Sequence, residues 1–486
     1  MQVLSTLLKN SSFEVLQGNL AMEISSLTFD SRSANEGSLF IAIVGTLNDG
    51  HQFIQSAYEL GCRDFVVEKS VSLPSDATII LVSKTDTALA ELACAFYGNP
   101  SQELKLVGIT GTNGKTTTTT LLYDLFMSLG HTSGLISTVV NKIGSKTSPS
   151  THTTPDPIRL NALLREMVEQ GCTYCFMEVS SHAIHQQRIH GISYTGAVFT
   201  NITHDHLDYH KTFAEYIRVK KQFFDGLNAN SFSLINGDDR NGSVMLQNTK
   251  AEKRSFALKT PADFKGKVLE NEISGLTLTI NGVELCSRLV GEFNALNLLA
   301  VYGVSTLLGL DSFDVLRGMS NLGSVEGRFQ YLRSQGGITA IIDYAHTPDA
   351  LENVLNTIAA IRKEGQKVIS VVGCGGDRDR EKRPVMAAIA AKKSQQVILT
   401  SDNPRTEDPQ SILKDMESGL STDGGQNALT IVDRAQAIKT AIMLAQAGDI
   451  VLIAGKGHEK YQEINGVKYD FDDFKLTEEF FNHLKK

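Results

Sequence analysis

A glycine-rich segment that ends in a lysine and several threonines is the clearest chemical signal in the chain. It reads GITGTNGKT at residues 108–116 and lies between an apolar run and a helical pattern. The backbone N–H groups of such a loop, with the positive end of the following helix, bind phosphate. The spacing departs from G-x-x-x-x-G-K-[ST], because Ile109 stands where the first glycine belongs. We expect a nucleoside triphosphate here, with Lys115 reaching the β and γ phosphates and Thr116 placing its hydroxyl on Mg²⁺.

Carboxylates and imidazoles follow the next apolar runs of the chain. Glu178 lies in MEVSSH at residues 177–182, and His204 lies in NITHDHLDYH at residues 201–210. Asp and Ser are also ordinary loop residues, so a set of solvated caps is the alternative interpretation. The pattern favours a second Mg²⁺ site at the edge facing the nucleotide, with Glu178 and His204 as ligands.

Apolar runs that alternate with helical patterns place these residues in two α/β domains. One series begins near Leu104, and a second begins after Gly327-Arg328; a polar, β-rich stretch near residues 250–290 interrupts the first series. One helix of the first series is expected to bury a single apolar stripe, formed by Leu160, Leu163, Leu164, Met167 and Val168. Such alternation is typical of parallel sheets, which bind ligands beyond the carboxyl ends of their strands. Residues 1–99 carry a smaller set of β-rich runs and end in a Gly-Asn-Pro linker. We therefore predict a small N-terminal α/β domain (1–99), a central ATPase-type parallel-sheet domain (100–327) and a C-terminal Rossmann-like doubly wound domain (328–486).

Composition excludes several classes of protein. The chain has 486 residues, 41% of them hydrophobic and 21% charged, and a net charge of −8, so it lacks the basic field that nucleic acid binding requires. No apolar run reaches the roughly 18 residues that span a bilayer, and the N-terminus lacks the pattern of a signal peptide. We expect a cytoplasmic protein. Six scattered cysteines predict reduced thiols rather than a disulfide framework or a zinc site.

Several motifs together resemble one known family. They are GITGTNGKT, THTTPD, MEVSSH, NITHDHLDYH, DYAHTPDAL, GCGGDRDREKRP, SDNPR and AGKGHE, which occur in this order from residue 108 to residue 459. The set is similar to the Mur ligases of peptidoglycan synthesis, and within them to the ligases that form the UDP-N-acetylmuramoyl tripeptide. The resemblance implies an ATP-dependent ligase that adds a diamino acid to the D-glutamate of UDP-N-acetylmuramoyl-L-alanyl-D-glutamate, through an acyl phosphate, for cell wall growth, cell shape and cell division.

The same resemblance implies roles for individual residues around ATP and the metal. Lys220 aligns with a family lysine that is carbamylated by CO₂ and helps to hold the second of two Mg²⁺ ions. Lys115, Glu178, His204 and Lys220 are then catalytic, and the implied metal ligands are Thr116, Glu178, His204 and carbamylated Lys220. The implied ATP-binding residues are Gly111, Thr112, Asn113, Gly114, Lys115, Thr116, Thr117, Asn294, Asn297, Arg328, Asp343 and His346.

Two further groups of residues are assigned to the other substrates by the resemblance. The UDP-substrate set is Phe29, Ser31, Thr46, Leu47, Asn48, Thr153, Thr154, Ser180, Gln186 and Arg188. The DNPR motif resembles that of members that take meso-diaminopimelate, whose extra carboxylate a guanidinium binds through two parallel hydrogen bonds. The diaminopimelate set is Arg378, Asp402, Asn403, Pro404, Arg405, Gly455 and Glu459.

Three other functions remain open from the sequence. Folylpolyglutamate synthetase has the same chemistry, but the arginines of GGDR and DNPR and the UDP-type first domain argue against it. A GTPase switch is disfavoured, because the segment beginning at Asn141 has Gly144 where guanine recognition requires Asp. A dinucleotide oxidoreductase needs G-x-G-x-x-G at the start of a helix, which neither series has.

We expect a monomer that binds small-molecule substrates and neither nucleic acid nor membrane.

Overall fold

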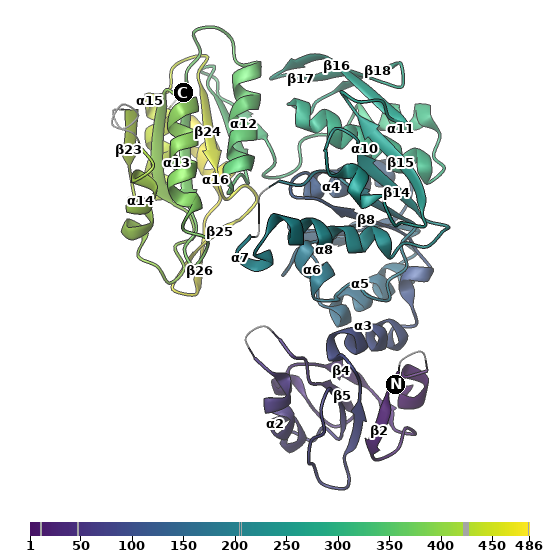
Figure 1. Ribbon diagram of the computed structural model, residues 1–486. Coiled ribbons are helices and arrows are strands. Elements are labelled where there is room, and N and C mark those ends of the chain that lie inside the picture. Colours follow the sequence, from purple (N-terminus) through teal and green to yellow (C-terminus); the bar gives the residue numbers. More distant parts are fainter. Residues whose placement is uncertain (10–11, 46–47, 204, 206, 421–426, 485) are drawn as a thin grey trace.

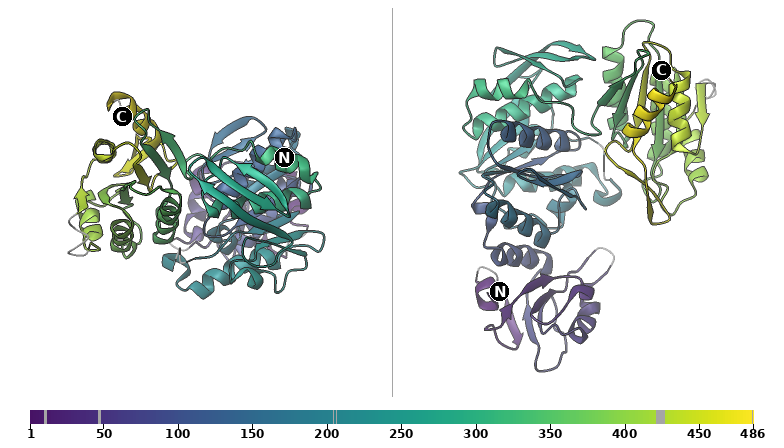
Figure 2. Two further views of the ribbon diagram at one scale, coloured as in Figure 1. Left: turned by 90° about the horizontal axis from the view of Figure 1, so that it is seen from above. Right: turned by 180° about the vertical axis from the view of Figure 1, so that it is seen from behind.

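The chain folds into three sheet-based units. The computed structural model describes residues 1–486 apart from 10–11, 46–47, 204, 206, 421–426 and 485. Figures 1 and 2 show the N-terminal unit at one end of the molecule, with the central unit next to it and the C-terminal unit beside the central one. This arrangement leaves the central unit in contact with both of the others.

A mixed sheet with helices forms the N-terminal unit. Its strand order is β2-β7-β6-β5-β4, with β2 antiparallel and the others parallel. The two faces of the sheet bury separate apolar clusters, one around Leu39 and Ile80 and one around Phe40 and Phe65. The elements are β1 (Gln2–Val3), α1 (Leu4–Leu7), β2 (Glu14–Gln17), β3 (Glu23–Ile24), β4 (Ser26–Thr28), β5 (Ser38–Ile41), α2 (Ile54–Glu59), β6 (Asp64–Val67), β7 (Thr78–Leu81) and α3 (Thr85–Phe96).

The segment predicted to be a linker has a defined conformation. Gly98 and Asn99 both adopt left-handed backbone angles, so the chain turns away from the axis of α3 after the helix ends. Arg165 donates from Nε to the carbonyl of Tyr97 at 2.8 Å and from Nη2 to that of Gly98 at 3.1 Å. Because Arg165 belongs to α5 (Pro157–Glu169) of the central unit, these bonds fix the N-terminal unit on the central one.

The central unit is built on a large, mainly parallel sheet. Over the described residues its order is β11-β10-β9-β12-β8-β13-β14-β15-β16-β17-β18, with parallel pairing from β9 to β16 and antiparallel hairpins at both ends. The strands are β8 (Lys105–Thr110), β9 (Ser133–Ile136), β10 (Val140–Ile143), β11 (Lys146–Pro149), β12 (Tyr174–Glu178), β13 (Gly196–Phe199), β14 (Phe232–Asn236), β15 (Glu252–Ala257), β16 (Phe264–Glu272), β17 (Gly275–Ile280) and β18 (Val283–Ser287).

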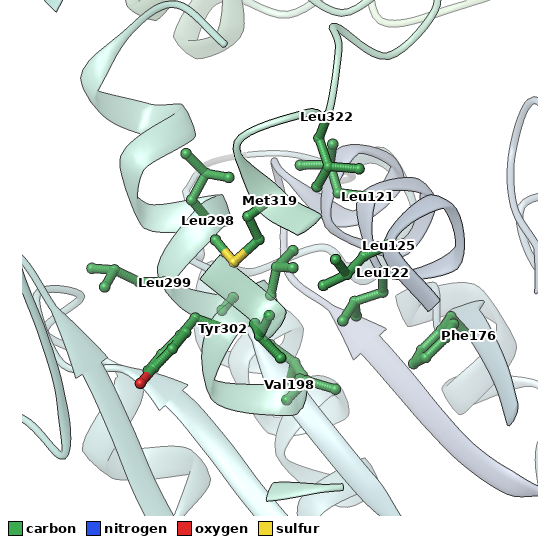
Figure 3. Packing of buried hydrophobic residues seen from close by; sticks show 14 of the residues in the cluster. Leu121, Leu122, Leu125, Phe176, Val198, Leu298, Leu299, Tyr302, Met319 and Leu322 are labelled. Atoms are coloured by element: carbon green, nitrogen blue, oxygen red, sulfur yellow. The ribbon is translucent and has the colours of Figure 1, made fainter. Parts of the chain in front are cut away.

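Helices cover both faces of this sheet. The cluster in Figure 3 joins Leu121 and Leu125 of α4 to Leu298 of α10 and Met319 of α11 on one face. On the other face the predicted stripe of α5 is buried at Leu160, Leu163, Leu164 and Met167, with Val168 half-buried. The helices are α4 (Lys115–Ser128), α5, α6 (Ser181–His185), α7 (Leu207–His210), α8 (Phe213–Asp225), α9 (Gly242–Met245), α10 (Glu292–Leu307) and α11 (Ser312–Met319).

The β-rich stretch near residues 250–290 extends the central sheet instead of interrupting the fold. Strand β15 pairs in parallel with β14, and β16 to β18 continue as an antiparallel meander. Alternate residues of β17, namely Leu276, Leu278 and Ile280, are buried in the same apolar cluster as α10. This period-two alternation explains why the stretch adds strands to one edge of the sheet.

The C-terminal unit is a doubly wound sheet. Its order is β19-β20-β24-β21-β22-β23, with β19 antiparallel at one edge and the other strands parallel. Helices α12, α13 and α14 cover one face, and α15 and α16 cover the other. The elements are β19 (Gln330–Arg333), β20 (Thr339–Asp343), α12 (Pro348–Ile361), β21 (Val368–Cys374), α13 (Lys382–Lys393), β22 (Gln396–Ser401), α14 (Pro409–Glu417), β23 (Ala428–Thr430), α15 (Arg434–Leu444), β24 (Ile450–Ala454), β25 (Tyr461–Ile464), β26 (Val467–Asp470) and α16 (Asp473–Leu484).

A buried ion pair ties the last helix to this sheet. Arg434 donates from Nε and Nη2 to the carboxylate of Asp473 at 2.9 and 2.6 Å, and both side chains are fully buried. Nη2 also donates to the carbonyl of Ala454 at the end of β24.

In the part of the chain that is described, no helix is both long and apolar enough to cross a bilayer.

The close packing of β13 on β14 gives a stability prediction. A Cβ built on Gly196 would collide with the Cζ, Cε1 and Cε2 atoms of the Phe232 ring. Gly196→Ala is therefore expected to lower the free energy of unfolding by about 1–3 kcal/mol through overpacking, measured by urea denaturation. Gly323→Ala is the control, because no atom lies within 4 Å of its Cβ position. Equal stability of the two variants would contradict this account.

Candidate active site

The phosphate loop joins β8 to α4 at the carboxyl edge of the central sheet. Gly111 has φ 151° and lies so close to the Thr200 hydroxyl that no Cβ would fit. Gly114 precedes the helix with φ 85°, and no side chain caps the first turn of α4. The first N–H groups of α4 therefore point toward the loop, and no capping side chain accepts hydrogen bonds from them. Such N–H groups suit an anionic ligand. This geometry fits the phosphates of a nucleotide.

Two lysines meet beneath this loop. Lys115 Nζ donates to the carbonyl of Gly111 at 2.8 Å, and Lys220 Nζ on α8 donates to the same oxygen at 2.9 Å. Lys220 is 1% exposed. Burial, together with the neighbouring Lys115 ammonium, lowers the pKa of Lys220 well below its usual value, and burial also lowers the pKa of Lys115. The predicted catalytic lysines are thus adjacent and favour the neutral amine more than ordinary lysines do.

Glu178 ends β12 as a fully buried carboxylate. Thr138 donates to it from the backbone N–H at 2.7 Å and from Oγ1 at 3.1 Å. Carboxylate and hydroxyl oxygens are ligands that suit Mg²⁺, so Glu178 and Thr116 fit the predicted metal role. The other predicted ligand, His204, lies outside the described residues. Across the described ranges, no three His, Cys, Asp or Glu side chains gather as a metal-binding group.

The predicted muramoyl-dipeptide residues form one network beside Glu178. Thr154 Oγ1 donates to the backbone carbonyl of Glu178 at 2.8 Å and accepts from the N–H of Ser180 at 3.1 Å. Arg188 donates from Nη1 to the carbonyl of Thr154 at 2.9 Å and binds the Gln186 side chain through Nε and Nη2. The Thr153 hydroxyl lies 3.1 Å from that of Thr138. The structure therefore brings this part of the predicted set together.

Arg328, at the start of the C-terminal unit, reaches the phosphate loop. Its Nη2 donates to Thr116 Oγ1 at 3.1 Å, and its guanidinium stacks 4.7 Å from the ring centroid of Tyr344. Asp343 accepts from the N–H of Phe329 at 2.7 Å, which fixes the backbone next to Arg328. His346 lies nearby with an exposed ring whose Nδ1 is 2.8 Å from the Tyr344 carbonyl. Residues predicted to bind ATP thus come from two units.

Asp349 provides a second contact across the same interface. Its Oδ2 accepts from Asn113 Nδ2 at 2.8 Å and from Thr203 Oγ1 at 3.0 Å. Asp349 was not among the predicted site residues, although an acidic residue after Thr-Pro is typical of a helix start, and it lies in the first turn of α12. Because Asn113 belongs to the phosphate loop, Asp349 links the C-terminal unit to that loop.

Two asparagines predicted to bind ATP lie in the interior of the central unit. Asn294 and Asn297 are both buried on α10, and Asn297 Nδ2 donates to Asn294 Oδ1 at 3.0 Å. Asn297 Oδ1 also accepts from Thr118 Oγ1 at 3.3 Å, in the first turns of α4. These residues therefore support the phosphate loop from behind. Thr112 and Thr117 are also buried, in the loop and in the first turn of α4 respectively.

The predicted diaminopimelate residues gather at the carboxyl edge of the C-terminal sheet. Asn403, after β22, donates from Nδ2 to Glu459 Oε2 at 2.8 Å. Gly455, after β24, has φ 121° and contacts the Asp402 carboxylate, where a side chain would collide. Arg405 donates from Nη1 to the carbonyl of Gly376 at 2.7 Å. Arg378 lies in that same loop after β21, and Pro404 lies between Asn403 and Arg405.

A buried lysine organises the charges of this cluster. Lys456 is fully buried, and its Nζ donates to Asn403 Oδ1 at 2.9 Å and to Glu459 Oε2 at 3.2 Å. Burial, reinforced by the Asp402 charge, raises the pKa of Glu459. Burial opposes ionisation of Asp402 as well, but the Lys456 ammonium, the Arg434 guanidinium and the N–H of Asn403 together outweigh it and lower the pKa of Asp402. Lys456 was not among the predicted site residues, although it stands inside AGKGHE.

Glu407 holds the two arginine-bearing loops together. Its carboxylate accepts from Arg383 at 2.8 and 3.0 Å and from the N–H of Asp377 at 2.6 Å. The hydrogen bond from the Arg383 guanidinium is the main cause that lowers the pKa of Glu407 to about 2. Nothing in the sequence distinguished Glu407 from other charged residues that lie just before a helix. The contact keeps the loop of Arg378 against the loop of Arg405.

The predicted uridine contacts lie in the N-terminal unit. Ser31 begins a short 3-10 helix that is capped by Asp30, and Phe29 before it is exposed. Asn48 is exposed in the loop that leads to Asp49. Thr46 and Leu47 lie outside the described residues. Phe29, Ser31 and Asn48 thus present polar and aromatic groups on the surface of a unit separate from the phosphate loop.

This combination of folds and sites defines a class: multidomain α/β enzymes that bind a nucleotide between a phosphate-loop sheet and a doubly wound sheet. Three family models match the chain: "Mur ligase family, catalytic domain" at residues 23–97, "Mur ligase middle domain" at 109–305 and "Mur ligase, glutamate ligase domain" at 327–457.

Full-length relatives agree with these matches. A Phocaeicola vulgatus protein named UDP-N-acetylmuramoyl-L-alanyl-D-glutamate--2,6-diaminopimelate ligase is 51% identical over 98% of this chain and 99% of its own length. A Cytophaga hutchinsonii protein of the same name is 52% identical over 100% of both chains. A solved structure of a ligase with that name has a TM-score of 0.71 and 31% identity, and covers 100% of this chain and 99% of its own. The chain belongs to the Mur ligase family.

The tight loop predicts the effect of one substitution on nucleotide binding. Gly111→Ala places a Cβ against Thr200 and Asn201, so the loop must move away from the N-terminus of α4. We expect at least a tenfold rise in the Kd for ATP, about 1.4 kcal/mol, measured by calorimetry. Gly130→Ala, also at positive φ but with no atom within 4 Å, is the control for backbone strain alone. Unchanged ATP affinity in Gly111→Ala would contradict the assignment.

Proposed function

We propose that this protein is the ATP-dependent ligase that joins meso-diaminopimelate to the D-glutamate of UDP-N-acetylmuramoyl-L-alanyl-D-glutamate in peptidoglycan precursor synthesis. The observation that carries the proposal is the cluster after β22 and β24, where the Arg405 guanidinium and the Glu459 carboxylate share one edge with Asn403. A guanidinium and a carboxylate suit the carboxylate and ammonium at the far end of a diamino diacid. The names of the full-length relatives support the same substrate.

The chemistry follows from the poor reactivity of a carboxylate. A carboxylate oxygen of the D-glutamate attacks the γ-phosphorus of ATP, ADP leaves, and an acyl phosphate forms. The amine of diaminopimelate then attacks the acyl carbon, loses a proton and expels inorganic phosphate as the amide forms. Positioning and neutralisation of phosphate charge are what the protein contributes. Lys115, which donates to the Gly111 carbonyl, and Arg328, which donates to Thr116 Oγ1, provide positive charge at the phosphate loop.

Glu178 and Thr116 would hold Mg²⁺, with His204 as the further ligand that we propose. Bound magnesium supplies positive charge that offsets the charge of the phosphates. We also propose that Lys220 carries a CO₂-derived carbamate and serves a second ion. Its buried amine, with a pKa lowered by burial and by Lys115, supports this assignment, because CO₂ reacts with the neutral amine.

The remaining assignments concern organisation. We propose that the N-terminal domain (1–99) binds the UDP-sugar, the central domain (100–327) binds ATP, and the C-terminal domain (328–486) binds the amino acid. Arg188, Gln186 and Thr154 support a path for the muramoyl dipeptide between the first and the central domain, because they lie beside Glu178. We further propose a cytoplasmic monomer whose partners are its small-molecule substrates.

The first test compares two amines in one assay. Phosphate release from ATP with UDP-N-acetylmuramoyl-L-alanyl-D-glutamate is expected with meso-diaminopimelate and to fall by orders of magnitude with L-lysine, up to about 10⁴. Arg405→Ala should lose most of this preference, because the guanidinium that pairs with the second carboxylate is gone. Lys392→Ala, which removes an exposed lysine on α13, is the control. Equal release with both amines would discard the substrate assignment and keep the ligase.

The second test concerns Lys220. Lys220→Ala is expected to reduce phosphate release by at least 100-fold, since the carbamate and its metal contact are lost. Short carboxylates such as acetate should restore part of the activity by replacing the missing oxygen ligands. Lys221→Ala, which removes a neighbouring lysine that pairs with Asp225, should remain active. Full activity of Lys220→Ala without added carboxylate would refute the assignment.

A further inference from the structure

The β25–β26 hairpin docks directly on the DNPR loop. The N–H of Arg405 donates to the carbonyl of Glu463 at 3.0 Å, and the N–H of Asn465 donates to the carbonyl of Arg405 at 2.7 Å. Asn403 Oδ1 accepts from the N–H of Glu463 at 2.9 Å, and Gln462 Nε2 donates to the carbonyl of Asp402 at 2.7 Å. Residues 462–465 of the hairpin therefore hold the DNPR loop of the proposed diaminopimelate site, although no sequence motif marked them.

This docking places a carboxylate beside the arginine that we propose for substrate selection. Glu463 Oε2 lies 3.6 Å from Arg405 Nε, and the two side chains are 26% and 22% exposed. Arg405 Nη1 is bonded to the Gly376 carbonyl, while its Nη2 donates to none of the residues that the structure describes. The guanidinium is thus held at one end and shares its charge with Glu463 at the other.

The position of Arg405 does not depend on the Glu463 carboxylate. Its backbone is held by the two hairpin hydrogen bonds at φ 52°, and its side chain is held by the Gly376 carbonyl. All of these contacts use backbone atoms of the hairpin or atoms of another loop. Replacement of Glu463 by Gln therefore leaves the supports in place and removes only a negative charge next to the guanidinium.

We propose that Glu463 is a specificity-determining residue that acts as an internal carboxylate on Arg405 and competes with the second carboxylate of the amino acid substrate. This inference rests on the proposed function of Arg405. When diaminopimelate binds, its carboxylate meets a guanidinium whose charge Glu463 already balances in part, and two carboxylates then share one cation. When lysine binds, Glu463 remains as the counter-ion of Arg405. The binding free energy lost because lysine has no second carboxylate is therefore smaller than it would be without Glu463. Glu463 thus limits the preference for diaminopimelate.

Glu463→Gln tests this role through selectivity. Phosphate release is measured with diaminopimelate and with L-lysine, and the ratio of the two kcat/KM values is compared with that of the unmodified chain. Because the pair is partly exposed, the KM for diaminopimelate is expected to fall about two- to fivefold with kcat unchanged. The kcat/KM for lysine should stay level or fall, so the ratio should rise at least twofold. Asp470→Asn is the matched control, since it removes one negative charge from an exposed position on the same hairpin.

The outcomes separate this inference from the proposed function. If the unmodified chain uses diaminopimelate and Glu463→Gln raises the ratio while Asp470→Asn does not, Glu463 acts through Arg405. If Glu463→Gln leaves the ratio unchanged, raises the KM for diaminopimelate, or shifts the ratio no more than Asp470→Asn does, the inference is overturned and the function stands. If the unmodified chain releases no phosphate with diaminopimelate, the proposed function is wrong and the role of Glu463 falls with it. Matching melting temperatures confirm that the variants are folded.

Discussion

The sharing of one carbonyl oxygen by two lysines is the constraint on which the central unit depends. Lys115 and Lys220 both donate to Gly111, inside a loop whose backbone is pressed against Thr200. Two ammonium groups so close together repel each other, and burial strengthens the repulsion. Anionic ligands relieve it, and so does loss of a proton from one amine. The loop, α4 and α8 are therefore arranged around positive charge that phosphate, or a modified lysine, can balance.

Side chains of the C-terminal unit contact the phosphate loop of the central unit. Arg328 and Asp349 bring a positive and a negative group from the C-terminal unit to Thr116 and Asn113 of the phosphate loop. The two contacts are made three residues apart along the loop, so they restrain the orientation of the units as well as their separation. Apolar contacts join the same two units, because Val290, Ile273 and Phe293 of the central unit pack in the apolar cluster of the C-terminal unit.

Sequence patterns predicted the elements better than the contacts between them. The apolar stripe of α5 and the strand-loop-helix context of residues 108–116 are local features, and both are confirmed. Asp349, Glu407 and Lys456 are different, because their significance depends on partners that are distant in the chain, such as Asn113 at 236 residues from Asp349. Nothing in the spacing of a charged residue shows which loop will face it after folding. The stretch at 250–290 interrupts the alternation of strands and helices, and its place in the sheet could not be predicted because its strands join an edge formed by residues earlier in the chain.

The buried pair of Arg434 and Asp473 links the last helix to the loop of the proposed amino-acid site. Asp473 begins the last helix, while Arg434 also holds the carbonyl of Ala454, immediately before Gly455 and Lys456. Loss of one partner from a buried ion pair costs about 3–5 kcal/mol, because the other charge is left unbalanced. A premature stop codon that removes only the last helix would therefore disturb the loop after β24, although that helix contributes no residue to the predicted site.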